Sequence, residues 1–139
     1  MNDPQLNAAY ADLGRLHMLR ALAGLETSIE QGTRLMHSVY SGNYRFLYGS
    51  ANEHEGYIIW AAIDRHSYLS LKRGGPMPRY RHEWNEGSLV LVLDVVLVAR
   101  ARGRFLTQLL ALTRQWRDIV LVRHDRPVRR YRRFRARQC

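Results

Sequence analysis

The sequence predicts a single α/β (α+β) domain in which helices flank a mixed β-sheet. Three observations favour this class: two stretches of helical periodicity come first, short apolar strands follow, and another helical stretch separates the longest strand from its successor. The chain has 139 residues, an ordinary size for one domain, and it is 46% hydrophobic, which is enough for a core. We therefore expect residues 1–139 to form one domain, with residues 126–139 as a basic edge strand or arm.

The first third of the chain has the pattern of two helices. Asp3 can cap a helix that carries Pro4 in its first turn, and the apolar residues that follow recur at helical spacing. We expect this helix to end at Gly24. A second helix is predicted over residues 27–40, and Gly42, within a Ser-Gly-Asn sequence, is expected to stop it.

Apolar strands and their connections occupy the middle of the chain. Residues 44–48 (YRFLY) and 56–63 (GYIIWAAI) are predicted as strands, and the polar loop between them indicates a hairpin. Residues 64–73 are expected to form a short helix ahead of a Gly-Gly-Pro loop. The apolar run 88–99 is predicted as a long buried strand, and leucines at helical spacing indicate a helix over residues 105–116.

The C-terminal third of the chain is strongly basic. From Arg100 onward thirteen arginines stand against two aspartates, a net +11, so residues 1–99 carry about −1 of the total +10. Residues 118–123 are predicted as a buried strand, and residues 127–134 as an edge strand or a disordered basic arm. The imbalance favours an acidic partner, and the aromatic rings between these arginines suit single-stranded nucleic acid as well as a solvated strand.

Composition disfavours several classes of protein. No stretch approaches the roughly 18–20 apolar residues that a membrane helix needs, and the polar N-terminus has no secretory pattern. Cys139 is the only cysteine, which excludes an intramolecular disulfide and fits a reducing compartment, so we expect a cytoplasmic protein. The six histidines lack metal-site spacing and no nucleotide-binding fingerprint occurs, so we expect no metal and no bound cofactor.

Asp94 interrupts the most apolar segment of the chain, HEWNEGSLVLVLDVVLV (residues 82–98). A carboxylate inside an apolar strand loses hydration, so it must pair with a cation, take up a proton or face a cleft. Such a residue often marks a functional site. The alternative is a structural ion pair with an arginine of the basic third.

A basic, glycine-containing segment, RARGRF (residues 100–105), lies between the long strand and the helix that follows it. Backbone N–H groups at a helix start can hold a phosphate, which makes four residues candidates for anion binding: Arg100, Arg102, Gly103 and Arg104. The segment partly resembles the R-x-x-G-x-G/A turn of Gcn5-related acyltransferases, which cradles a pyrophosphate. Arg100 and Gly103 match that turn, whereas Phe105 stands where the turn has a small residue. A basic loop that caps a helix is the alternative.

Three motifs, in order and spacing, resemble the toxin-activating lysine acyltransferases, the haemolysin-activating family. SGNYRFLY (residues 41–48) resembles that family's strand entry after its second helix, and GYIIWAAI (residues 56–63) resembles its Gly/Ala-Tyr-x-x-Trp-Ala strand. HEWNEGSLVLVLD (residues 82–94) resembles its D-W-x-S-G sequence followed by an apolar strand that ends in Asp. The similarity begins in the first helix and covers nearly the whole chain.

The resemblance implies a Gcn5-like acyltransferase fold, a dimer, and transfer of a fatty acyl group to lysines of a protein acceptor. The donor would be acyl-acyl carrier protein (or acyl-CoA), and the strongly acidic carrier would meet Arg100, Arg102 and Arg104. A His and an Asp carry catalysis in that family, and Asp94 falls on the Asp. The family's His stands in an S-x-x-H-R-like segment. The corresponding segment here, AGLETS (residues 23–28), contains no His, so His17, several residues earlier, is the candidate base.

Three functions remain open on these observations. The first is acyl transfer by Asp94 and His17. The second is a non-catalytic protein-binding module on the same fold, of the kind that a phage or mobile element encodes. The third is binding or modification of nucleic acid through the Arg-rich end. The partner of Asp94 discriminates between the first two, because a hydrogen-bonded histidine favours an enzyme and a sealed arginine pair favours a scaffold.

Overall fold

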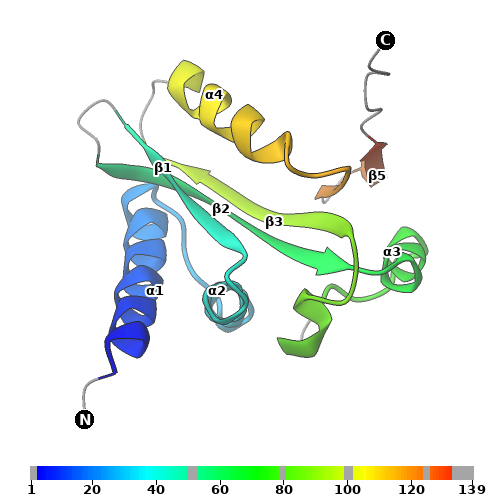
Figure 1. Cartoon of the computed structure of the whole chain (residues 1–139), viewed down its shortest axis with the longest axis horizontal. Coiled ribbons are helices and arrows are strands. Elements are labelled where there is room, and N and C mark those ends of the chain that lie inside the picture. The colour runs from blue at the N-terminus through cyan, green and yellow to red at the C-terminus, as the bar shows by residue number, and fades with distance from the viewer. Residues whose placement is uncertain (1–2, 50–52, 79–80, 99–101, 124–125, 133–139) are drawn as a thin grey trace.

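The computed structural model describes residues 3–49, 53–78, 81–98, 102–123 and 126–132. They form one small α+β domain with four α-helices and a mixed five-stranded sheet, as the sequence predicts (Figure 1). The helices are α1 (Pro4–Leu22), α2 (Ile29–Ser41), α3 (Arg65–Lys72) and α4 (Arg102–Thr113), with a 3-10 turn η1 (Arg81–Trp84). The strands are β1 (Tyr44–Tyr48), β2 (His54–Ile63), β3 (Leu89–Leu97), β4 (Asp118–Arg123) and β5 (Arg126–Arg132).

The sheet has the order β1-β2-β3-β4-β5, and only its β3–β4 pair is parallel. Helix α4 makes the crossover between these two strands, which the helical stretch between two apolar runs had indicated. Parallel pairing with β4 covers Leu89 to Val92, so the second half of β3 pairs with β2 alone. The register between β2 and β3 also shifts between Ile59 and Trp60, and Asp94 lies opposite Ile59 just past this irregularity.

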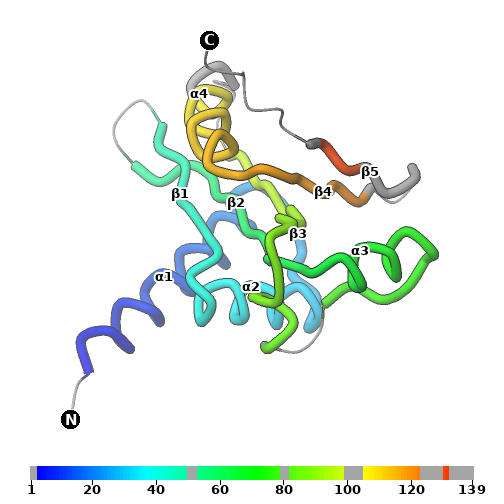
Figure 2. The backbone as a smooth tube through the Cα atoms, turned by 45° about the vertical axis from the view of Figure 1, so that its right-hand side comes forward, coloured from blue at the N-terminus to red at the C-terminus, as the bar shows by residue number. Residues whose placement is uncertain are grey.

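Helices cover both faces of the sheet, with α1 and α2 on one face and α4 on the other (Figures 1 and 2). On the first face, a buried cluster joins Leu16 and Leu19 of α1 and Leu35 of α2 to Tyr57 and Ile59 of β2. Side chains point alternately to the two sides of a strand, so the intervening residues of β2 pack under α4. There the cluster contains Ile58, Trp60, Val90 and Leu112.

Local sequence signals account for the ends of α2. Ser28 accepts a hydrogen bond from the Gln31 N–H while the Gln31 side chain accepts one from the Ser28 N–H, which is a complete capping box. This cap explains why the helix begins at Ile29 and not at residue 27, as the periodicity predicted. Gly42 ends the helix with φ of 73°, a conformation that favours glycine.

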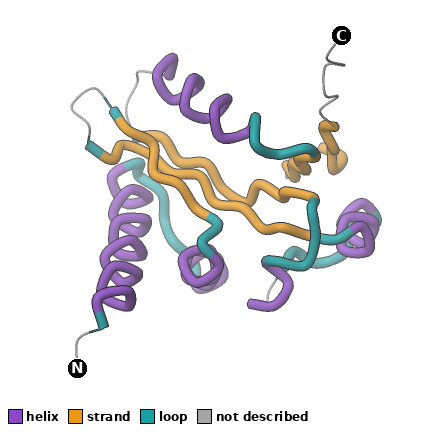
Figure 3. Tube along the Cα trace, in the orientation of Figure 1, coloured by secondary structure: helices purple, strands orange, loops and turns teal. Residues whose placement is uncertain are grey.

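The two edges of the sheet differ in what covers them. Residues 126–132 form strand β5, so this part of the tail is the edge strand and not the disordered arm (Figure 3). Residues 133–139, which include Cys139, lie outside the described part of the chain. At the opposite edge, the Gln108 side-chain amide of α4 donates to the Tyr48 carbonyl and accepts from the Tyr48 N–H, both at 2.8 Å. This amide occupies the hydrogen-bonding positions that a neighbouring strand would use.

Candidate functional site

Asp94 lies on the face of the sheet that α1 and α2 cover, at the place where β3 has lost its neighbour β4. The first three residues of β3 are buried, but the Asp94 side chain is 30% exposed. The sequence predicted a strand that is buried along its whole length, and this prediction is wrong for the second half of β3. The carboxylate sits where the apolar core gives way to solvent.

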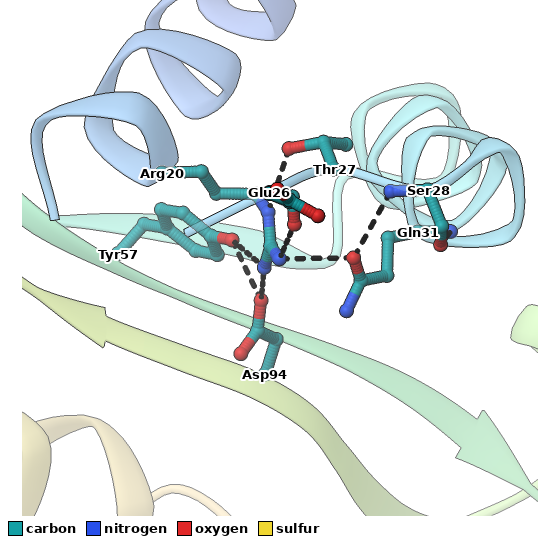
Figure 4. Close-up of polar contacts among 7 residues, drawn as sticks. All are labelled: Arg20, Glu26, Thr27, Ser28, Gln31, Tyr57 and Asp94. Atoms are coloured by element: carbon teal, nitrogen blue, oxygen red, sulfur yellow. Dashed lines mark hydrogen bonds and ion pairs between the residues drawn. The ribbon is translucent and has the colours of Figure 1, made fainter. Parts of the chain in front are cut away.

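The partner of Asp94 is Arg20, at the C-terminal end of α1 (Figure 4). Arg20 Nη1 donates to Asp94 Oδ2 at 2.6 Å, and the arginine side chain is only 4% exposed. The same Nη1 donates to the Tyr57 hydroxyl at 3.3 Å, and that hydroxyl donates to Asp94 Oδ2 at 2.7 Å. A guanidinium, a phenol and a carboxylate therefore form a closed triangle between α1, β2 and β3.

The rest of the Arg20 guanidinium is held by the segment that leads into α2. Its Nε donates to Thr27 Oγ1 at 2.9 Å, and its Nη2 donates to the Glu26 carbonyl at 2.9 Å and to Gln31 Oε1 at 3.0 Å. Together with Asp94 and Tyr57 these make five acceptors, which equals the number of N–H donors in a guanidinium. Arg20 thus links α1, the α1–α2 connection, α2 and the sheet through one side chain (Figure 4).

The protonation states of Arg20 and Tyr57 limit the chemistry of this site. Burial disfavours the Arg20 charge, but the oxygens of Tyr57 and Asp94 outweigh that effect and raise the pKa above its ordinary value. Burial also raises the pKa of Tyr57, and the Asp94 carboxylate adds to the rise. Both groups therefore keep their protons at neutral pH, and neither can accept a proton from a substrate. The remaining acceptor is Asp94, whose Oδ1 has no partner among the described residues.

His17 does not join this cluster. It lies on α1 three residues before Arg20 and is exposed, and its Cε1 atom is 3.7 Å from the place where a Cβ on Gly32 would be. The side chain therefore lies against α2, and Asp94 receives its hydrogen bonds from Arg20 and Tyr57. The structure brings together the predicted aspartate and an arginine, and that arginine belongs to the first helix and not to the basic third.

Arg20 and Tyr57 are the site residues that the sequence reasoning missed. The signal for Arg20 was its position, since it follows Leu16 by four residues and therefore falls on the buried face of α1. Tyr57 lies two residues before Ile59 on β2, so both side chains point to the same face of the sheet, and Asp94, opposite Ile59, points there too. Neither signal names the partner, because a one-dimensional pattern gives the face of an element but not its neighbour.

The predicted anion-binding segment coincides with the start of α4. Arg102, Gly103 and Arg104 have helical backbone in its first turn, and Phe105 is fully buried. Arg100 lies outside the described residues, as do the side chains of Arg102 and Arg104. The acyltransferase turn has a small residue at the position of Phe105. Here the large side chain at that position is buried and serves packing.

The HEWNEG sequence that carries much of the resemblance has a structural role here. Trp84 is fully buried, and Asn43 donates to its carbonyl at 3.0 Å. Glu86 N–H and Gly87 N–H both donate to the Ala62 carbonyl, at 2.8 and 3.3 Å. A Cβ on Gly87 would lie 2.3 Å from the Ile63 carbonyl oxygen, so a larger residue would clash with β2. The motif therefore fixes the entry of the chain into β3.

Part of the basic third is neutralised inside the fold. Arg130 of β5 pairs with Asp118 of β4 at 3.0 Å, and its guanidinium lies 5.5 Å from the centre of the Tyr68 ring. Arg114 and Arg117, in contrast, are exposed after the end of α4.

The described residues contain no group of three or more side chains that could hold a metal ion. Within the same residues, every helix is too short or too polar to cross a membrane.

Comparison with known proteins adds no relative to this picture: no family model matches the chain, and no curated protein matches it. The similarity to the toxin-activating acyltransferases therefore rests on the three motifs quoted above.

Proposed function

We propose that this chain is a non-catalytic protein-binding module on an acyltransferase-like fold, acting in the cytoplasm. One observation carries the proposal: the cation next to Asp94 is an arginine whose guanidinium already has five acceptors. Lysine acylation needs a group that takes a proton from the attacking ammonium. An arginine with a raised pKa cannot do so, and it holds Asp94 in a structural pair.

The partner that this proposal favours is an acidic protein. Acyl carrier protein is the example that the resemblance suggests. From Arg100 onward the chain carries thirteen arginines against two aspartates, and Arg114 and Arg117 are exposed. Opposite charge raises the rate of encounter and makes the complex sensitive to salt. The single cysteine at position 139 supports a reducing, cytoplasmic setting for such a complex.

The test mixes the purified chain with acyl-acyl carrier protein and a lysine-bearing acceptor protein. We expect the carrier to bind at low salt, and we expect the mass of the acceptor to stay unchanged. The double variant Arg114→Glu/Arg117→Glu should weaken binding at least tenfold. Its matched control is Arg65→Glu/Arg73→Glu, which reverses two exposed arginines of the first 99 residues and should leave binding nearly unchanged. If acyl carrier protein does not bind at low salt, the proposal of an acidic protein partner is refuted.

Lysine acyl transfer is the second candidate, and two observations favour it: the Asp94 side chain is partly exposed, and no residue in the described part of the chain bonds to its Oδ1. In this candidate Asp94 is the base, and Arg20 and Tyr57 position it. The lysine amine attacks the thioester carbonyl, the new C–N bond replaces the C–S bond, and the carrier thiol leaves with the proton. An acceptor that gains the mass of the acyl group, and loses that gain with Asp94→Asn but not with the exposed Glu86→Gln, would establish the enzyme and end the binding-module proposal.

A nucleic-acid partner is the third outcome of the same binding experiment. Phosphate contacts make the logarithm of affinity fall linearly with the logarithm of salt concentration. Tight binding of a single-stranded oligonucleotide with that dependence, together with no affinity for acyl carrier protein, would replace the protein partner by nucleic acid.

A further inference from the structure

The outer side of α4 carries leucines where a surface helix ordinarily carries charge. Leu106 and Leu110 are 57 and 49% exposed and lie one helical turn apart, so they form a ridge on this side. The inner side of the helix packs on the sheet through Phe105, Leu109 and Leu112. Helices of globular proteins ordinarily present polar residues opposite their buried face. Figure 1 shows α4 as the outermost labelled element on this face of the sheet.

Arginines continue the ridge at the C-terminal end of α4. The Arg114 N–H donates to the Leu110 carbonyl at 3.0 Å, so the helical path extends to Arg114, which is exposed, as is Arg117. The sequence from residue 95 to residue 117 contains five arginines and no aspartate or glutamate. Long arginine side chains can cover apolar surface with their stems while their charge stays in a polar layer. The outer side of α4 thus combines apolar and cationic groups and has no acidic residue.

Tyr131 of β5 adds an exposed ring on the same face of the sheet. It pairs with Ile119 of β4, and Ile119 pairs with Val90 of β3. Directly paired residues point to the same side of a sheet, and Val90 belongs to the cluster under α4. Tyr131 therefore points to the side of α4, and it is 49% exposed. Tyrosine is enriched at membrane surfaces, where one end of its ring is in an apolar layer and the other is hydrated.

The acidic residues are concentrated in the other part of the chain. Ten of the twelve aspartates and glutamates precede residue 95. Of the remaining two, Asp118 pairs with Arg130 at 3.0 Å, and Asp125 lies outside the described residues. An anionic surface therefore attracts the side of α4 and repels the side of α1 and α2. Three of the ten are exposed on or beside these two helices, across the sheet from α4: Asp3, Glu26 and Glu30.

We propose that the protein docks on the surface of an anionic lipid bilayer through this side of the molecule. The leucines enter the headgroup region, and the arginines meet lipid phosphates. A bilayer accommodates a convex helix, whereas a protein partner has to supply a groove that matches it. The protein lies on the membrane and does not cross it, in agreement with the length and polarity of its described helices. We call the docking surface the α4 face, and it consists of Leu106, Leu110, Arg114, Arg117 and Tyr131.

The first experiment is co-sedimentation with vesicles of phosphatidylcholine alone and with vesicles that contain about one third phosphatidylglycerol. We expect binding to the mixed vesicles only. Leu106→Ser/Leu110→Ser should weaken it about tenfold and leave the circular dichroism spectrum unchanged, because both side chains are about half exposed. The matched control, Leu25→Ser/Ile29→Ser, removes two exposed apolar side chains beside α2 and should bind as wild type does. Binding that ignores phosphatidylglycerol, no binding to either vesicle, or a Leu106→Ser/Leu110→Ser variant no weaker than the control would overturn the docking.

The second experiment locates the contact with an environment-sensitive fluorophore on an introduced cysteine, in a Cys139→Ser background. On Leu110→Cys the emission should shift to the blue when mixed vesicles are added, because the label leaves water for the headgroup region. On Ile29→Cys, across the sheet, the emission should stay unchanged. The opposite result, or no shift at either position in a chain that co-sediments, would show that the protein attaches through other residues.

The inference goes beyond the acidic protein partner and does not rest on it, although both use Arg114 and Arg117. Vesicles and acyl carrier protein are therefore offered to the chain separately. Binding to the carrier and to neither kind of vesicle refutes the membrane and leaves the protein partner. Binding to mixed vesicles and not to the carrier refutes the protein partner and leaves the membrane.

Discussion

Replacing Asp94 by asparagine removes the negative charge that pairs with Arg20 while keeping a carbonyl oxygen in its place. The Arg20 Nη1 and the Tyr57 hydroxyl therefore retain an acceptor, and the loss is that of the charge. The other acceptors of Arg20 are neutral oxygens of Tyr57, Thr27, Glu26 and Gln31. The variant leaves a guanidinium that is 4% exposed without the carboxylate that pairs with it.

The magnitude follows from the burial of the two partners. Breaking a fully buried ion pair by removing one partner destabilises a protein by about 3–5 kcal/mol. Water reaches the Asp94 side chain, which is 30% exposed, and weakens the interaction that is lost. We therefore expect Asp94→Asn to lower the free energy of unfolding by about 2 kcal/mol, a large part of the 5–15 kcal/mol that is usual for a domain.

A double-mutant cycle with Arg20→Met isolates the interaction. Urea denaturation followed by circular dichroism gives the free energy of unfolding of each variant at pH 7. In the Arg20→Met background the cation is gone, so Asp94→Asn should change stability by less than about 0.5 kcal/mol. Glu86→Gln, at an exposed position, is the matched control and should stay within about 0.5 kcal/mol of wild type. An Asp94→Asn effect of the same size in both backgrounds would refute the ion pair as the source of the loss.

Four further substitutions have expected outcomes. Arg20→Lys should lower stability by about 2–3 kcal/mol in urea denaturation, because an ammonium has three donors for five acceptors, and an unchanged midpoint would contradict this. Burial and the nearby Arg15 lower the pKa of His54, so the unfolded state takes up the proton first as pH falls through about 6.5. The melting temperature should therefore decrease from pH 7.5 to pH 5.5, and His54→Gln should reduce that decrease; an equal decrease in the variant would exclude His54. Gly87→Ala should destabilise by about 1–3 kcal/mol because its Cβ would lie 2.3 Å from the Ile63 carbonyl oxygen, whereas Gly14→Ala, in open space, should not destabilise the subunit.

The fold was largely accessible from the sequence because its signals are local. Alternating and continuous apolar runs gave strands 44–48 and 118–123 with the bounds that the structure has, and the Ser-Gly-Asn stop placed the end of the second helix within one residue. The 3-10 turn Arg81–Trp84 was not predicted, because it depends on the contact of Trp84 with the core and on no period of the sequence.

The candidate site was accessible only in part. A carboxylate in an apolar strand needs a compensating group, and for that reason the sequence alone identified Asp94 as a candidate site residue. The identity of that group depends on how α1 crosses β3, which brings together residues 74 positions apart. Sequence reasoning looked to the basic third for an arginine, since charge was concentrated there, but those residues lie on other elements. Arg20 carried its own signal as a cation on an otherwise apolar helix face.

The Gln108 amide at the end of β1 restricts how this protein can assemble. Strand addition at a sheet edge needs free N–H and C=O groups, and at Tyr48 both are already taken. A foreign strand that paired with β1 at Tyr48 would have to displace the Gln108 amide of α4 from both of these hydrogen bonds. At this end of β1, strand addition therefore competes with an existing pair of hydrogen bonds and is disfavoured.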